Sequence, residues 1–166
     1  MKLIWAFILL FSLTPFSGQI LAAPAGTSVA KADDGTIYIK KRKMPLNVLY
    51  KSVLLAFENN GYFVTSEHNI GKSMQPFAQR WGKSYNRNKI EEIRSMVLSN
   101  PWYANNIANA DPVLLAMFPL HVTLIQKGKY TTILFVRPSK VAYQSRGQTV
   151  AEELEKDVIR IFENII

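Results

Sequence analysis

The chain has 166 residues, 48% of them apolar, which is enough for one domain with a hydrophobic core. It carries 20 Lys and Arg against 12 Asp and Glu, a formal charge of +8, and a basic surface attracts anionic partners. It has no cysteine, which excludes disulfides, thiolate catalysis, cysteine-attached haem and cysteine-bound zinc or clusters.

The first 25 residues have the layout of a cleavable signal peptide. Lys2 precedes an apolar run over residues 3–11, and a polar break and small residues follow. An uncleaved anchor needs about 20 apolar residues, and a proline and a glycine interrupt that length here. We predict cleavage after Ala25, or alternatively after Ala23. The protein is therefore expected to be exported, to the periplasm of a Gram-negative bacterium or to the medium.

Residues 26–35 are predicted to be a flexible mature tail with a loose hairpin at Asp34–Gly35, and residues 36–166 a single domain. Apolar and polar residues alternate over 36–42, which predicts a strand. Pro45 then suits the first turn of a helix that ends at Asn60-Gly61. Its apolar stripe has helical spacing and consists of Leu46, Leu49, Tyr50, Val53, Leu54 and Phe57.

A second short strand is predicted over 62–66, and residues 67–89 are expected to be a broken helix or a long loop. Residues 93–98 fit a helix or a strand, and we favour a strand. The clearest hairpin joins residues 120–126 to 131–137, since both arms are rich in β-branched and aromatic residues. A final helix over 149–165 is predicted to begin with a capping box formed by Thr149 and Glu152.

Three stretches follow one another in a characteristic order: "NNGYFV", "MVLSNPWYANNIANADP" and "LAMFPLHVTLIQKGKYTTILFVRPS". Their marks are Gly61, Asn100-Pro101, Asp111-Pro112 and Pro119. In this order the chain resembles domain-of-unknown-function family 302 over residues 36–140, with the helix at 149–165 included. The resemblance implies an α+β fold, an antiparallel sheet of about four to five strands with helices packed on one face. It implies no activity.

Some members of that family carry a cysteine before the Asn-Pro pair and another after the hairpin proline. This chain has Ser99 and Leu120 at those positions. Any role for a thiol in such members is therefore absent here.

A sheet covered on one side leaves its other face available to a partner. Leu120, Val122 and Leu124 are expected to face the helices, so the side chains between them face the opposite way. Asn100-Pro101 is interpreted as a corner that ends a strand and begins a helix, with an aromatic pocket beneath it. The candidate ligand-binding residues are His121, Thr123, Trp102, Tyr103, Phe118 and Asn100.

A metal site is a second candidate, formed by His68, Glu67 and His121 if the second strand and the hairpin are neighbours. The competing interpretation is that each histidine stands alone with no chemical role, since they lack spaced carboxylate companions. No cofactor is predicted. Gly71-Lys72-Ser73 and Gly82-Lys83-Ser84 imitate the end of a phosphate loop but lack its earlier glycine, so nucleotide hydrolysis is set aside.

A basic edge is the third candidate. Its predicted polyanion contacts are Lys40, Lys41, Arg42, Lys43, Arg80, Lys83 and Arg87. Phe77, Trp81 and Tyr85 recur every four residues within an acid-free stretch, a pattern typical of a stacking platform or an interfacial membrane segment. The alternative is that these rings pack inward under a solvated basic edge.

We therefore predict an exported, non-catalytic domain that binds a small molecule or a partner protein through its open sheet face and adjoining aromatic loops. Two alternatives stay open, an enzyme or metal protein that uses the two histidines, and weak association with a polyanion or membrane surface. A homodimer is also open. Export disfavours a nucleic acid as the partner.

Overall fold

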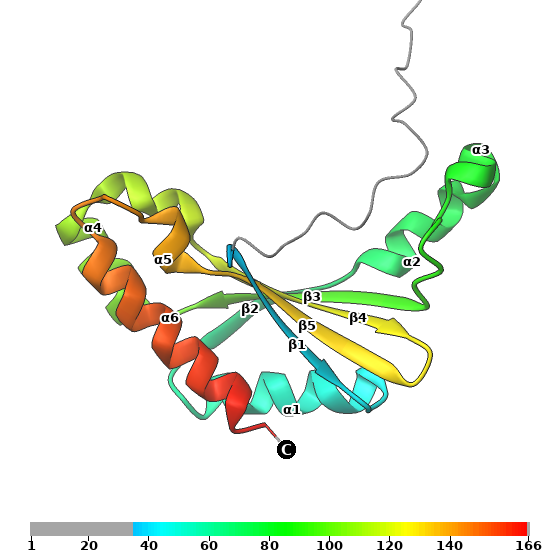
Figure 1. Cartoon of the computed structure of the whole chain (residues 1–166), viewed down its shortest axis with the longest axis horizontal. Helices are drawn as coiled ribbons and strands as arrows, with labels where there is room; N and C mark the ends of the chain where they lie inside the picture. The colour runs from blue at the N-terminus through cyan, green and yellow to red at the C-terminus, as the bar shows by residue number, and fades with distance from the viewer. Residues whose placement is uncertain (1–34, 166) are drawn as a thin grey trace, which may run out of the picture. The chain divides into compact units, whose positions relative to one another are not determined.

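The computed structural model describes residues 35–165, so the predicted signal peptide, its cleavage site and nearly all of the tail lie outside it. The elements, in chain order, are β1 (Ile37–Arg42), α1 (Leu46–Glu58), β2 (Phe63–Asn69), α2 (Ile70–Met74), η1 (Gln75–Phe77), α3 (Ala78–Trp81), η2 (Gly82–Ser84), β3 (Glu92–Ser99), α4 (Pro101–Ala110), η3 (Pro112–Met117), β4 (Leu120–Lys127), β5 (Tyr130–Val136), α5 (Pro138–Val141) and α6 (Gln148–Glu163). The five strands form one antiparallel sheet in the order β1-β5-β4-β3-β2 (Figure 1). The predicted α+β class and strand number are confirmed.

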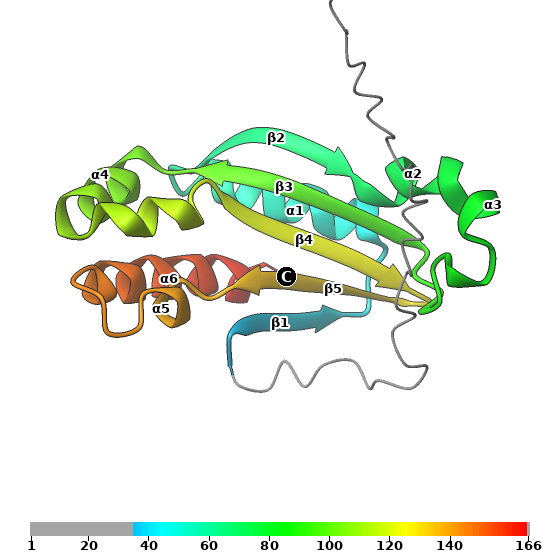
Figure 2. The same cartoon turned by 90° about the horizontal axis from the view of Figure 1, so that it is seen from above.

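Helices α1 and α6 lie on the same side of this sheet (Figures 1 and 2). On β4 the residues that face them are Leu120, Val122 and Leu124, all buried as predicted, and they alternate with less buried positions. The predicted stripe of α1 packs against them, with Leu49 and Val53 fully buried. The apolar face of each element therefore meets the others in one core, and burial of that surface stabilises the fold.

The side of the sheet opposite α1 and α6 is called the open face below. Seen from above, no helix of the described residues lies over the middle of the strands (Figure 2). Its side chains come from alternate positions that the strand pairings bring into rows across the sheet. They are Ile37, Ile39, Lys41, Ser66, His68, Ile93, Ser95, Val97, His121, Thr123, Ile125, Thr132, Leu134 and Val136.

The end of α6 is held against β1 by a buried lysine. Lys40 lies on the covered side of β1, where its ammonium donates to the carbonyl of Phe162 at 3.0 Å and to the Glu163 carboxylate. Tyr38 donates to the same carboxylate at 2.6 Å and stacks on Phe162. A cation at a helix C-terminus satisfies carbonyls that have no partner within the helix.

Two predicted elements differ from the structure. Strand β2 runs to Asn69 rather than ending at residue 66, so His68 lies within the strand and not beyond it. The predicted capping box at Thr149 and Glu152 is wrong, because α6 begins one residue earlier with Gly147 at its N-cap and no side-chain cap. The side chain of Gln148 instead accepts from the backbone of Gln144 at 2.9 Å.

Candidate functional site

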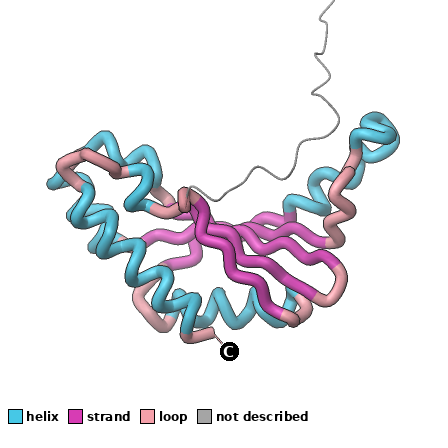
Figure 3. Tube along the Cα trace, viewed as in Figure 1, coloured by secondary structure: helices cyan, strands magenta, loops and turns pink. Residues whose placement is uncertain are grey.

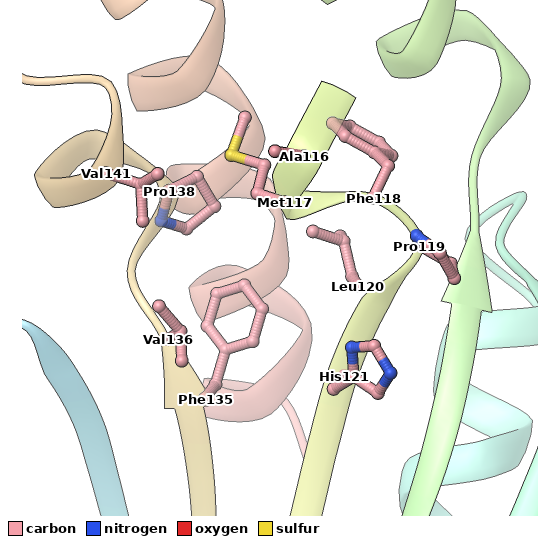
Figure 4. A pocket seen from close by; sticks show the side chains of 10 residues that line it. All are labelled: Ala116, Met117, Phe118, Pro119, Leu120, His121, Phe135, Val136, Pro138 and Val141. Carbon is pink, nitrogen blue, oxygen red and sulfur yellow. The ribbon is translucent and has the colours of Figure 1, made fainter. Parts of the chain in front are cut away.

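An apolar pocket of about 360 Å³ lies at one end of the sheet, between η3, the start of β4 and the turn from β5 into α5 (Figure 4). Its lining residues are Ala116, Met117, Phe118, Pro119, Leu120, His121, Phe135, Val136, Pro138 and Val141. His121 is the one titratable side chain among them. The other nine lining residues are apolar, so His121 supplies the one polar side chain of the lining.

The pocket exists because β4 and β5 separate at this end. The pairing of β4 with β5 starts at Val122 and Phe135, so Leu120 and His121 of β4 have no partner on β5. Pro119 directly precedes β4, and Pro138 begins α5 two residues after the end of β5, and neither residue has an amide hydrogen with which to extend the pairing. The space left by the missing rungs is closed from above by Met117 and Phe118, as Figure 4 shows.

The wall formed by α5 is anchored from below by a buried carboxylate. Glu155 of α6 is 5% exposed, and Arg137 reaches its Oε1 with both Nε and Nη2 at 2.7 Å. The backbone nitrogen of Ser139 donates to Oε2 at 3.0 Å, and the Ser139 hydroxyl donates to the same oxygen. These three residues, called the Glu155 clamp, fix the turn that carries Pro138 and Val141.

Two of the predicted ligand residues, His121 and Phe118, line the pocket, and Thr123 lies next to it on the open face. The hydroxyl of Thr123 donates to Ser95 at 3.1 Å, and this serine donates to the carbonyl of Val122. The open face and the pocket are thus continuous through His121, which is exposed and belongs to both.

The other three predicted ligand residues lie away from this pocket. Asn100 caps α4 by accepting from the backbone nitrogens of Trp102 and Tyr103, and its amide donates to Gly61 at 3.3 Å. This is the structural corner that the sequence predicts. Trp102 is 60% exposed over a separate hollow, whereas Tyr103 is buried in the core.

The structure does not bring the three candidate metal ligands together. His68 is paired with Ser95, and His121 with Val97, so strand β3 and an offset of two residues along it lie between the two histidines. A shift in register after Val64 turns Glu67 to the covered side, where it pairs with Arg94 at 3.6 Å. No cluster of three His, Cys, Asp or Glu side chains suited to a metal occurs within residues 35–165.

Glu67 belongs to a small polar network on the covered side of the sheet. Arg94 lies over the ring of Tyr50 at 4.0 Å, and the Tyr50 hydroxyl contacts the carbonyl of Ser95 at 3.4 Å. Burial, reinforced by Glu67, raises the pKa of Tyr50, so its hydroxyl keeps its proton. Glu67 therefore serves the packing of α1 against the sheet.

The predicted basic edge divides into separate groups. Lys40 is buried against α6 and is not part of an exposed edge, which corrects the sequence-based prediction. Lys41 and Lys43 remain exposed, Arg42 is half-buried, and Lys41 lies over the ring of Tyr130 at 4.2 Å. Arg80, Lys83 and Arg87 belong to a different segment, between β2 and β3, and all three are exposed.

Several pocket residues were not predicted from the sequence. Phe135 and Pro138 come from the far side of the hairpin, and Met117 and Val141 from short helices with no amphipathic repeat. The signal that was present is the position of Pro119 and Pro138, which directly flank the two predicted hairpin arms, 120–126 and 131–137. Two prolines at the same end of a hairpin indicate that the ladder stops there.

Among the described residues, no helix has the length and apolarity to span a bilayer. The family model described as "Domain of unknown function DUF302" matches residues 38–165. None of the curated proteins compared with the chain matches it.

Among solved structures, the chain is similar to the crystal structure of an uncharacterized conserved protein DUF302 from Bacillus stearothermophilus. The TM-score is 0.67 at 12% sequence identity, and the match covers 79% of this chain and 98% of that chain. At this identity the similarity shows the fold alone.

Proposed function

The chain belongs to the DUF302 family, which is named for its unknown function, and we propose that it binds a small, mainly apolar molecule without catalysing a reaction. The observation that carries this proposal is the apolar pocket with His121 at its edge. Ligand sites in proteins are commonly concave and apolar, with few polar groups that set orientation.

The size and lining of the pocket support a small ligand. Its volume of about 360 Å³ lies at the lower end of the usual range for ligand sites, roughly 300 to 1,000 Å³. Val136 and Val141 at its wall are each 48% exposed, so apolar surface is available to a ligand. Covering that surface is favourable at about 25 cal/mol per Å² before the costs of association.

His121 is the polar contact in this proposal. Neutral imidazole can both donate and accept a hydrogen bond, so it can orient a ligand that carries one carboxylate, hydroxyl or carbonyl group. No second acid or base belongs to the pocket lining, so a reaction that needs a proton donor and a proton acceptor lacks one of them. This supports binding over catalysis.

Octanoate and indole are suitable probes, because one combines an apolar chain with a charged end and the other is a flat ring with one donor. We expect titration of isotope-labelled full-length protein to shift the amide resonances of residues 116–121 and 135–141, apart from Pro119 and Pro138, which have no amide hydrogen. Val141→Trp, which fills the pocket, is expected to weaken binding about tenfold or more, since it displaces the ligand from its apolar wall.

The matched control is Val113→Trp, because Val113 is 78% exposed on η3 and does not line the pocket. It adds the same ring nearby and is expected to leave binding unchanged. His121→Phe is expected to weaken octanoate more than indole. Shifts confined to the far end of the sheet, or equal losses in both tryptophan variants, contradict the proposed site.

A further inference from the structure

The segment between β2 and β3 projects from the end of the sheet opposite the pocket (Figures 1 and 3). This segment, residues 70–89, is called the arm. It contains the short helices α2, η1, α3 and η2, and none of its side chains is buried. Since the arm adds nothing to the buried core, the core gives no reason for its apolar residues.

The arm is nevertheless held at both ends. At the start, Gly71 lies so close to β3 that an added Cβ would be 3.3 Å from the nitrogen of Ile93. At the end, the Asn86 side chain accepts from the backbone nitrogen of Ile90 at 2.9 Å and donates to its carbonyl at 2.7 Å. The base of the arm thus packs closely on β3, and a hydrogen-bonded turn closes the arm at its other end.

Three aromatic rings form a ladder along the arm. Phe77 and Trp81 stack with their centroids 5.1 Å apart, and Tyr85 follows at 6.3 Å. Phe77 and Trp81 are 44% and 42% exposed, so the interpretation that these rings pack into the core is wrong. Ile70 adds further exposed apolar surface at the base of the arm.

The charge of the arm has one sign. It contains five cations and no acidic residue, and the cations are Lys72, Arg80, Lys83, Arg87 and Lys89. All five are exposed, and none forms an ion pair with a carboxylate of the described residues. A surface with this charge attracts anions, and the attraction is not neutralised by the protein itself.

We propose that the arm docks on the surface of a membrane that contains anionic lipids. Phe77 and Trp81 enter the headgroup region, where aromatic rings are favoured, and the surrounding cations contact lipid phosphates. This combination of exposed rings and basic residues is typical of interfacial segments that lie on a bilayer without crossing it.

The same residue types also occur at sites for single-stranded nucleic acid, but the geometry favours lipid. Binding of bases uses the open faces of aromatic rings. Phe77 and Trp81 are stacked at an interplanar angle of 16°, so each already covers one face of the other. Ile70 offers apolar contact that a phosphate backbone does not use, whereas a lipid surface does.

Binding to vesicles of phosphatidylcholine with and without phosphatidylglycerol tests the proposal, with the full-length protein in each case. The measured quantity is the ratio of the partition coefficients for the two vesicles. Because the apolar residues 3–11 are present in every variant, they do not alter the comparison. We expect a preference for anionic vesicles that weakens as salt is raised.

Arg80→Gln, Lys83→Gln and Arg87→Gln combined are expected to reduce this preference about tenfold or more, since each cation near an anionic surface adds to attraction. The matched control removes the same charge from α1, α5 and α6 by combining Lys51→Gln, Lys140→Gln and Lys156→Gln, all exposed. It is expected to change the ratio less than about twofold at moderate salt, because these charges lie away from the arm.

The aromatic part is tested separately. Phe77→Ser with Trp81→Ser is expected to lower binding to anionic vesicles about tenfold, whereas Trp102→Ser with Val113→Ser removes exposed apolar surface elsewhere and leaves binding unchanged. Circular dichroism checks that each variant is folded. Equal losses in arm and control variants, no preference for anionic vesicles, or tighter binding to a single-stranded oligonucleotide would each overturn the proposal.

Discussion

Arg137→Met tests whether the Glu155 clamp holds the pocket wall. The substitution keeps an unbranched apolar stem but removes both nitrogens that reach Oε1 of Glu155 at 2.7 Å. The carboxylate is then left in a 5% exposed position with only the donors of Ser139. Breaking a buried ion pair from one side costs about 3–5 kcal/mol. Arg137 is one-third exposed, so water can replace part of its contact, and we expect about 3 kcal/mol.

The decisive comparison is the double variant Arg137→Met, Glu155→Leu. If the loss arises from a carboxylate left without its cation, removal of the carboxylate should restore stability, and we expect the double variant to recover about 1–2 kcal/mol relative to Arg137→Met alone. Equilibrium unfolding in urea measures this as a shift in midpoint at constant slope.

The control for this experiment is Arg160→Met, which breaks the pair of the exposed Arg160 with Asp157 and is expected to cost far less stability than Arg137→Met, because water solvates the exposed guanidinium. A double variant that is no more stable than Arg137→Met would refute the reasoning. So would an equal cost for Arg137→Met and Arg160→Met.

Three further predictions concern the core and its edges. Tyr62→Phe removes a buried hydroxyl that donates to Asp157 at 2.9 Å and whose pKa is raised by burial and by Asp157. We expect the free energy of unfolding in urea to fall by about 1 kcal/mol. No loss would show that water replaces the bond. Phe162→Ala removes a ring packed against Tyr38, Phe57 and Phe135 and is expected to lower the free energy of unfolding by about 3–5 kcal/mol. A loss below about 1 kcal/mol would contradict the central place of Phe162 in the core. Hydrogen bonds from Lys40 and Tyr38 lower the pKa of Glu163 from its usual 4.5. These bonds therefore contribute to the stability of the fold above that pH, and the contribution is lost as pH falls through the folded-state pKa. Glu163→Gln should therefore lower Tm by about 2 °C at neutral pH and by less at about pH 3, and a constant difference would contradict the linkage.

The prediction of the sheet succeeded where the pattern had a single physical interpretation. In β4, Leu120, Val122 and Leu124 alternate with polar residues, and only a strand with one covered face places all three in a core. The prediction of the helix start at α6 failed because Thr149 and Glu152 have the right spacing, whereas the packing of α6 sets its first turn at Gln148. A local capping signal is worth about 1 kcal/mol, which tertiary contacts outweigh.

The candidate site was predicted only in part. His121 and Phe118 were identified because they lie on or beside a strand whose orientation the sequence gives. The sequence also predicts that Trp102 lines a pocket with Phe118 under the Asn100-Pro101 corner, but α4 directs Trp102 to another surface. The pocket wall at α5 depends on Glu155, which is distant in sequence, and no local pattern indicates that contact.

By itself, the sequence determined the approximate positions of most strands, the two long helices, the absence of thiol chemistry and the single sign of charge on the arm. These depend on residue type and short-range periodicity, which any reader of the chain can see. Only the tertiary structure decided that β4 and β5 part to leave a pocket, that His68 and His121 lie on either side of β3, and that Phe77 and Trp81 stay exposed. These features depend on register and on contacts between distant segments, where a shift of one residue turns a side chain to the other face.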